Sequence, residues 1–227
     1  MGTLDAVDED VCYEFKFTVC AEAYDGGDTE AVIDVEGEVL CREGHGDDTG
    51  VLRAGELSGS VLRVGWALNH RESLFDHCDA HSQTLHEIHA LLFRERSYEL
   101  RSEIHEELGG VIEQDVLVLD VIHVFPQHRG RGLGLTLAHR FIELFGRGCG
   151  VAVCKPFPLQ FDVTYDGAPE RIAQAGLDRY SCDCKLATAK LARHWGRLGF
   201  RRLLRGPYYA LNLEHRLPAL ASLTSVR

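Results

Sequence analysis

The stretch that decides the fold is VLVLDVIHVFPQHRGRGLG, residues 116–134. Residues 116–124 are almost continuously apolar, which is typical of a strand buried on both faces of a sheet. A glycine-rich loop follows, and from about residue 133 to residue 145 the apolar residues recur at helical spacing. We therefore expect a strand, a glycine-rich turn and a helix in direct succession.

This order of elements predicts an anion-binding loop. The first N–H groups of a helix have no intrahelical partner and lie at the positive end of the helix dipole. Glycines allow the backbone to approach a phosphate closely, and Arg129 and Arg131 add positive charge. The spacing of Gly130, Gly132 and Gly134 matches neither G-x-x-x-x-G-K-[ST] nor G-x-G-x-x-G.

The chain after this loop continues the alternation of strands and helices. We expect a short strand at residues 150–157 and a helix whose apolar stripe runs over residues 187–198 and ends at Gly199. Residues 200–213 read as extended chain. The polar stretch at residues 159–183 has no clear pattern.

The chain before the deciding stretch reads differently. Residues 11–23, 31–40 and 60–68 have strand patterns and suggest a meander. Residues 74–108 have helical spacing, which indicates two helices, or one helix broken near residues 94–97.

Composition and charge bound the class of protein. The chain has 227 residues, of which 45% are hydrophobic and 26% charged, so we expect one globular domain spanning residues 1–227. Residues 1–110 carry 8 basic and 25 acidic side chains, whereas residues 111–227 carry 16 and 10. A basic half suits a polyanionic ligand, and an acidic half could attract a cationic one. Basic stripes interleaved with aromatic residues are absent from the sequence, which argues against nucleic acid as a partner.

Compartment is inferred from what the sequence lacks. It shows no signal or transit peptide pattern and no run of about 20 apolar residues, so we expect a cytoplasmic protein without membrane association. The eight cysteines are scattered without a C-x-x-C pair and read as free thiols.

Two motifs resemble those of the GNAT superfamily of N-acetyltransferases. The family signature is Q/R-x-x-G-x-G/A after a strand that often ends in Val-x-Pro, and this chain has Val-Phe-Pro at residues 124–126 and Gln-His-Arg-Gly-Arg-Gly at residues 127–132. A second family element is a helix that ends in an aromatic residue followed three positions later by Gly-Phe. Here it reads Trp-Gly-Arg-Leu-Gly-Phe at residues 195–200. The resemblance covers residues 111–213.

The resemblance implies a fold and a cofactor. The fold is α/β with mixed α+β character: a central mixed, mostly antiparallel sheet flanked by helices, with the strands at about 116–124 and 150–157 splayed apart. The co-substrate is acetyl-CoA. Its pyrophosphate would lie on the loop, and its pantetheine arm on the preceding strand. The implied cofactor-binding residues are Ile122, His123, Val124, Gln127, His128, Arg129, Gly130, Arg131, Gly132, Leu133 and Gly134.

The implied reaction is attack of an amine on the thioester, which requires a base. Asp120 is the candidate, because strand alternation predicts that it shares a face with Ile122 and Val124, and burial would raise its pKa. His123 is a weaker candidate on the opposite face. Tyr208 and Tyr209 are candidates for the general acid, although tyrosines in strands usually pack, and solvent could serve instead.

The sequence departs from the family in three places. Trp195 stands where relatives usually have the Tyr that acts as general acid, and we expect Trp195 in the core. Thr188 stands where relatives often have a cofactor-contacting Asn. The helices at residues 74–108 follow several strands instead of lying between the first two, so residues 11–110, expected on the acceptor side, do not identify the acceptor.

Several functional hypotheses remain after the sequence has been read. The first is an acetyl-CoA-dependent N-acyltransferase that acts on a small-molecule or peptide amine. The second is a non-catalytic acyl-CoA-binding sensor or regulatory domain. A nucleotide-binding protein that uses the same loop for ATP is third, but the sequence offers neither the lysine nor the metal ligand of such a site. No metal site is expected, and a homodimer is left open.

Overall fold

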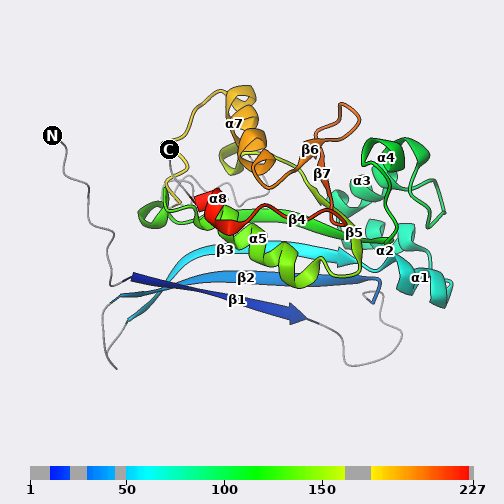
Figure 1. Cartoon of the computed structure of the whole chain (residues 1–227), viewed down its shortest axis with the longest axis horizontal. Coiled ribbons are helices and arrows are strands. Elements are labelled where there is room, and N and C mark those ends of the chain that lie inside the picture. Colours follow the sequence, from blue (N-terminus) through cyan, green and yellow to red (C-terminus); the bar gives the residue numbers. More distant parts are fainter. Residues whose placement is uncertain (1–10, 21–29, 44–49, 162–174, 225–227) are drawn as a thin grey trace.

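The computed structural model describes residues 11–20, 30–43, 50–161 and 175–224. Its centre is one seven-stranded sheet in the order β1-β2-β3-β4-β5-β7-β6 (Figure 1). All neighbouring strands are antiparallel except β4 and β5, which are parallel. The expected mixed, mostly antiparallel sheet flanked by helices is therefore confirmed.

The first three strands form the predicted meander. They are β1 (Val11–Cys20), β2 (Val32–Glu43) and β3 (Val51–Leu62). The third strand was predicted at residues 60–68, but most of that range forms the helix α1 (Val64–His70). The misplacement has a physical reason: β3 carries glycines at positions 55 and 59 that hide its alternation, and both approach the backbone of β4 closely.

Among the described residues, four helices precede residues 116–134. After α1 come α2 (Leu74–His81), α3 (Gln83–Leu92) and α4 (Ser102–Glu107). The chain breaks near residues 94–97 as expected, and it breaks again at Ser82, whose hydroxyl caps α3 by accepting the N–H of Leu85.

The second half follows the predicted order. Its elements are β4 (Asp115–Val124), α5 (Leu133–Phe145), β5 (Cys149–Cys154), α7 (Cys184–Gly196), β6 (Arg201–Arg202), β7 (Tyr209–Asn212) and α8 (Leu220–Thr224), with short 3₁₀ turns at η1 (Pro126–His128) and η2 (Leu159–Phe161). Of the unassigned stretch at 159–183, residues 162–174 lie outside the described residues.

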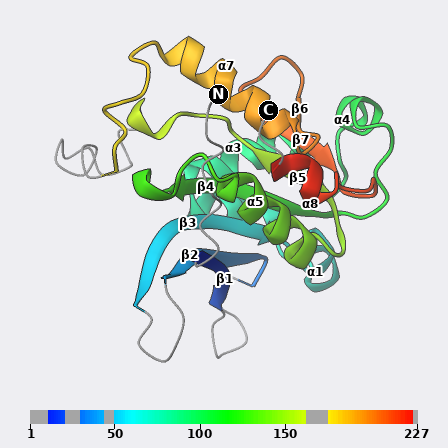
Figure 2. The same cartoon turned by 60° about the vertical axis from the view of Figure 1, so that its left-hand side comes forward.

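The two faces of the sheet bury different helices. Val116 and Val118 of β4 pack with α1–α4, whereas Leu117 and Leu119 pack with α5, α7 and α8. In Figure 1, α1–α4 gather at one end of the molecule, and in Figures 1 and 2 α7 lies above β4. Because β4 is covered on both faces, it reads as a continuous apolar run.

Candidate functional site

A cavity of about 540 Å³ opens where β4 and β5 stop pairing. The β4–β5 ladder ends at Leu119 and Cys154, although β4 continues to Val124. Residues 120–124 therefore have no β5 partner, and all five line the cavity. The helix α7 and parts of residues 157–160 and 177–181 form the other walls. Hydrogen bonding between the two strands thus stops in the region where the sequence predicted that they part.

A β-bulge at Asp120 shapes this part of β4. Ser58 of β3 pairs with Val121 and Gly59 pairs with Leu119, so Asp120 is the extra residue. The bulge reverses the alternation of side chains, and Ile122 and Val124 consequently pack with the α5 side of the core. The expectation that Asp120 shares a face with Ile122 and Val124 is wrong for this reason.

The glycine-rich loop forms the wall next to α5. Gly132 is the N-cap residue of α5 with φ 76°, and Gly130 has φ 80°, so both adopt the left-handed conformation that favours glycine. The first intrahelical bond runs from the N–H of Thr136 to the carbonyl of Gly132. The N–H groups of Leu133 and Gly134 therefore have no acceptor within the helix, and both residues line the cavity.

The residues of the loop serve different purposes. Gly130, Gly132, Leu133, Gly134, His128 and Arg129 line the cavity, whereas Gln127 and Arg131 are exposed and do not. His128 is buried, and its Nδ1 lies 3.1 Å from the hydroxyl of Tyr13 on β1. The loop is thereby attached to the far edge of the sheet.

Arg129 is engaged by the protein itself. Its guanidinium donates to the carbonyl oxygens of Val124 at 2.8 Å, Ala175 at 2.5 Å and Gly176 at 3.1 Å, and it lies 5.1 Å from the ring of Tyr180. Most of its donors are therefore used in holding residues 175–180 against the end of β4. The sequence predicts Arg129 as part of the charge of the anion loop, whereas its contacts show that it also holds residues 175 and 176 against the end of β4.

His123 belongs to the same group of contacts. Its Nε2 lies 3.3 Å from Nη2 of Arg129, and since arginine only donates, Nε2 is the acceptor. Its Nδ1 lies 3.5 Å from a carboxylate oxygen of Glu56 on β3. The ring is buried and has partners on both sides, so packing explains His123 better than a role as base.

Arg129 still lines the cavity with its charge, and further positive charge comes from residues that the sequence did not indicate. Lys190 of α7 and Arg197, which caps the C-terminus of that helix and donates to the carbonyl of Leu223, line the cavity. Lys155, which directly follows β5, lines it too. His194 of α7 lines it too, and burial, helped by the charge of Arg197, lowers the pKa of its ring. Lys190, His194 and Arg197 recur at helical spacing in the sequence. Only the packing of α7 over β4 shows that they face the cavity.

Trp195 is buried in the core on the α5 side, as predicted, and it also reaches the cavity wall. Thr188 does not line the cavity.

A cluster of acidic and basic side chains adjoins the β5 end of the cavity. Its members Asp120 and Lys155 line the cavity, whereas Glu87 and Tyr208 are not lining residues. The hydroxyl of Tyr208 donates to Oε2 of Glu87 on α3 at 2.6 Å, and Nζ of Lys155 lies 3.2 Å from the same oxygen. The Lys155 ammonium is also 5.3 Å from the centre of the Tyr208 ring. Burial raises the pKa of Tyr208 most, and the hydrogen bond to Glu87 and the negative charges of Glu87 and Asp120 raise it further.

The structure places the three predicted catalytic residues, Asp120, Tyr208 and Tyr209, in different environments. Asp120 lines the cavity near Tyr208 but is exposed, so the expectation that it is buried is wrong. Tyr208 is buried as a neutral donor, and it does not line the cavity. Tyr209 points to the opposite face, where it packs with the α5 side of the core, and it does not line the cavity. The sequence did not indicate Glu87, because its contacts depend on packing of α3 against residues 68 and 121 positions away.

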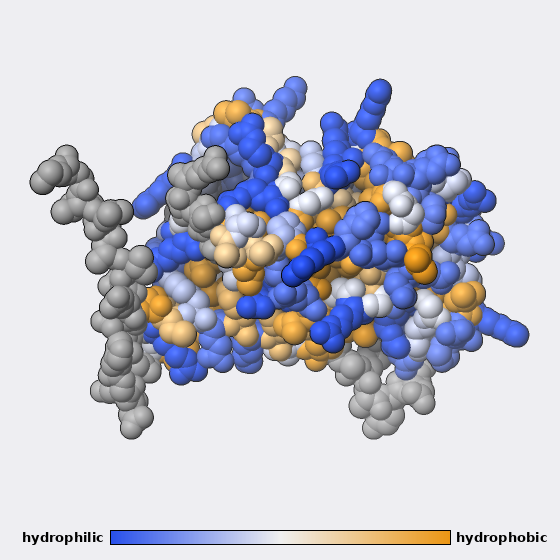
Figure 3. Space-filling view, in the orientation of Figure 1, coloured by the Kyte–Doolittle hydropathy of each residue, from blue (hydrophilic) through white to orange (hydrophobic). Residues whose placement is uncertain are grey.

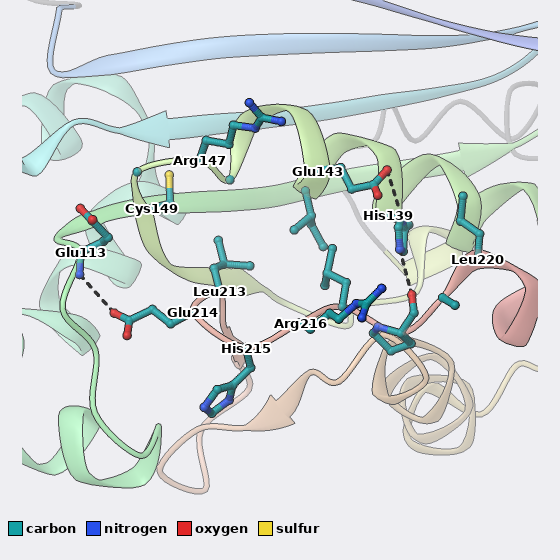
Figure 4. Close-up of a pocket in the computed structure, with 16 residues that line it drawn as sticks. Glu113, His139, Glu143, Arg147, Cys149, Leu213, Glu214, His215, Arg216 and Leu220 are labelled. Carbon is teal, nitrogen blue, oxygen red and sulfur yellow. Dashed lines mark hydrogen bonds and ion pairs between the residues drawn. The ribbon is translucent and has the colours of Figure 1, made fainter.

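A second cavity of about 550 Å³ lies at the start of β5 (Figure 4). His139 is buried there between the carbonyl of Pro218, at 2.9 Å from Nε2, and Glu143, at 3.4 Å from Nδ1. Glu214 accepts the N–H groups of Ile112 and Glu113. These polar groups join the C-terminal segment to α5 and to the residues just before β4. We therefore assign them a structural role.

Other features of the described residues bear on the class of function. Within those ranges there is no group of three or more His, Cys, Asp or Glu side chains that could hold a metal ion. No helix in the described part of the chain is long and apolar enough to cross a membrane. No protein-family model matches the chain, and comparisons with curated proteins and with solved structures returned no match.

Proposed function

We propose that this protein is an acyl-CoA-dependent N-acyltransferase that moves an acetyl or related acyl group to an amine. The observation that carries the proposal is the convergence of three features at one cavity. These are the half of β4 that has no β5 partner, the N-terminus of α5 behind a glycine-rich loop, and the side chains of Asp120 and Lys155, of which Lys155 contacts Glu87.

The loop end suits the CoA pyrophosphate. The N–H groups at the start of α5 supply hydrogen-bond donors and a positive dipole end, and Lys190 and Arg197 supply charge. The backbone of residues 120–124, left without a β5 partner, can pair with the amide groups of a pantetheine arm as an added strand would.

The cluster end suits the chemistry. Asp120 takes the proton of the attacking amine, the nitrogen bonds to the carbonyl carbon, the carbon–sulfur bond breaks, and the leaving thiolate receives a proton from solvent. Burial raises the pKa of Cys154, which ends β5, so this thiol stays protonated at neutral pH and is a poor nucleophile. This supports direct attack in a ternary complex over an acyl-enzyme at that cysteine.

The test begins with the cofactor. Isothermal titration with acetyl-CoA and with Mg-ATP should give binding of acetyl-CoA and none, or much weaker binding, of Mg-ATP. A panel of small amines and lysine peptides then identifies the acceptor by CoA release. Acetyl-CoA binding without any acylation would favour the sensor, and tighter binding of Mg-ATP would contradict the proposal.

A matched pair of variants locates the cofactor. A Cβ at Gly134 would meet Val124, Ile122 and His194 at ordinary distances of 3.7, 3.9 and 4.0 Å, so Gly134→Ala should keep acetyl-CoA binding. Gly134→Leu places a branched side chain in the cavity and should weaken binding about tenfold or more. Equal affinity of the two variants would place the cofactor elsewhere.

A further inference from the structure

Strand β1 is an open edge of the sheet. It pairs with β2 over all ten of its residues, and in the described part of the chain no strand pairs with its other side (Figure 1). A long edge presents unpaired N–H and C=O groups, which makes it a template for another strand.

The two faces of β1 differ in chemistry. On one face Glu14 and Lys16 are well exposed, with 51% and 60% of their side-chain surfaces accessible. On the other face Tyr13, Phe15 and Phe17 are half-buried against the α5 side of the core. Figure 3 shows hydrophobic residues among hydrophilic ones along the lower margin of the molecule, where Figure 1 places β1.

We propose that β1 pairs antiparallel with β1 of a second copy of this chain, around a two-fold axis at Phe15. Residues directly opposite each other in an antiparallel pair share a face of the sheet. This register places Lys16 opposite Glu14 of the second copy, twice by symmetry. On the other face it places Phe15 opposite Phe15 and Phe17 opposite Tyr13, both favourable cross-strand pairs.

The charges of the neighbouring strands fit the same register. Glu38 of β2 lies directly opposite Lys16, at 3.6 Å, and its other oxygen lies 3.3 Å from Arg53 of β3. Glu14 in turn lies 2.8 Å from Arg42 of β2. The row across the interface therefore reads Arg53, Glu38 and Lys16 from one copy, then Glu14 and Arg42 from the other, with alternating sign throughout.

Other registers lose this complementarity. An axis at Lys16 would place Lys16 opposite itself, and an axis at Phe17 would place it opposite Thr18. An axis between two residues would set the charged face against the aromatic one. The Phe15 axis is the register that pairs opposite charges and aromatic rings together.

The test is a charge swap measured by sedimentation equilibrium across about 1–100 μM protein. The wild type should show twice the 25.3 kDa mass of the chain at the upper concentrations. Glu14→Lys alone or Lys16→Glu alone creates two like-charge pairs, and each should raise the dimer dissociation constant about tenfold or more. The double variant E14K/K16E exchanges the charges and should restore the dimer.

Arg53→Glu is the matched control. It reverses a charge on the same face and breaks ion pairs of similar length, but β3 lies two strands from the edge. It should leave the dissociation constant within about threefold of the wild type. Circular dichroism of each variant checks that the sheet is intact.

A cross-link tests the register itself. The same axis places Cys12 opposite Thr18 of the second copy, and both are exposed. Thr18→Cys should therefore form an intermolecular disulfide to Cys12 under oxidised glutathione, which accepts the two electrons and is reduced to two thiols. Peptide mass mapping identifies the link, and T18C/C12S should lack it. A wild-type monomer at all concentrations, or a dimer unaffected by both single reversals, would overturn the proposal.

Discussion

The two ends of the main cavity are built in different ways. At the loop end, the lining residues between positions 121 and 134 all belong to one continuous segment, which runs through β4, η1 and the start of α5. At the cluster end, Glu87, Asp120, Lys155 and Tyr208 come from four separate segments. Local sequence can specify the first end, whereas the second exists only after α3, β4, β5 and β7 have packed together.

This difference suggests that binding and chemistry can be separated by mutation. Changes at the loop end should alter affinity for the cofactor or the stability of its wall. Changes at the cluster end should alter turnover. The experiments below are ordered by the size of the effect.

Asp120→Asn should have the largest effect, on turnover. Loss of a general base reduces the rate about 100-fold or more, while the affinity for acetyl-CoA should stay within about twofold. Steady-state kinetics and titration of the same protein give both values. Asp76→Asn, an exposed carboxylate on α2, should change neither. Turnover within threefold of the wild type would remove Asp120 from the chemistry.

Gly59→Ala should weaken the packing of β3 against β4 and α5, the two elements that carry the loop end of the cavity. A Cβ there would lie 2.5 Å from the carbonyl of Val118 and 2.7 Å from the ring of Phe141 on α5. We expect the free energy of unfolding in urea to fall by about 2–3 kcal/mol. In Gly65→Ala the nearest atom is 3.7 Å away and the site is helical, so this control should gain about 0.5–1 kcal/mol. Equal stability of the two variants would mean that β3 and α5 do not pack this closely.

Arg129→Lys tests whether an arginine of the loop end is structural. An ammonium cannot reproduce its bonds to Val124, Ala175 and Gly176, and we expect a loss of about 2 kcal/mol in unfolding free energy. Arg131→Lys, at the exposed position two residues further on, should stay within about 0.5 kcal/mol. If both substitutions were neutral for stability while the first weakened acetyl-CoA binding, the residue would act on the ligand instead.

Tyr208→Phe should give the smallest change in stability, about 1 kcal/mol, because Glu87 keeps access to water and to Lys155. It should also alter the response to acid. The hydrogen bond from Tyr208 is the main reason that the pKa of Glu87 lies below its ordinary 4.5. A folded-state pKa below the unfolded one stabilises the protein above pH 4.5, and this contribution is lost as the pH falls further.

Urea unfolding between pH 7 and pH 3 measures that response. The wild type should lose more stability on acidification than Tyr208→Phe does. Parallel curves for the two proteins would show that the hydroxyl does not favour the Glu87 carboxylate.

The sequence predicted the loop end well for identifiable reasons. The apolar run of β4 and the helical stripe of α5 are strong local patterns, and α5 begins and ends at the expected residues 133 and 145. The error at β3 arose where glycines replace the alternating side chains and where Ser58 and Gly59 face a bulge. Bulges leave little trace in a single sequence, so the face occupied by Ile122 and Val124 could not be deduced.

What the sequence by itself determined is the β4–loop–α5 unit, because glycine positions, apolar periodicity and helix-end chemistry act over a few residues. Only the tertiary structure decided which charges face the cavity. Arg129 holds two segments together because the carbonyls of residues 175 and 176 lie beside it. Glu87 contacts Tyr208 and Lys155 because α3 packs against the end of β5. Hydrogen bonds and ion pairs depend on distances between segments, and those distances are set by packing of the whole core.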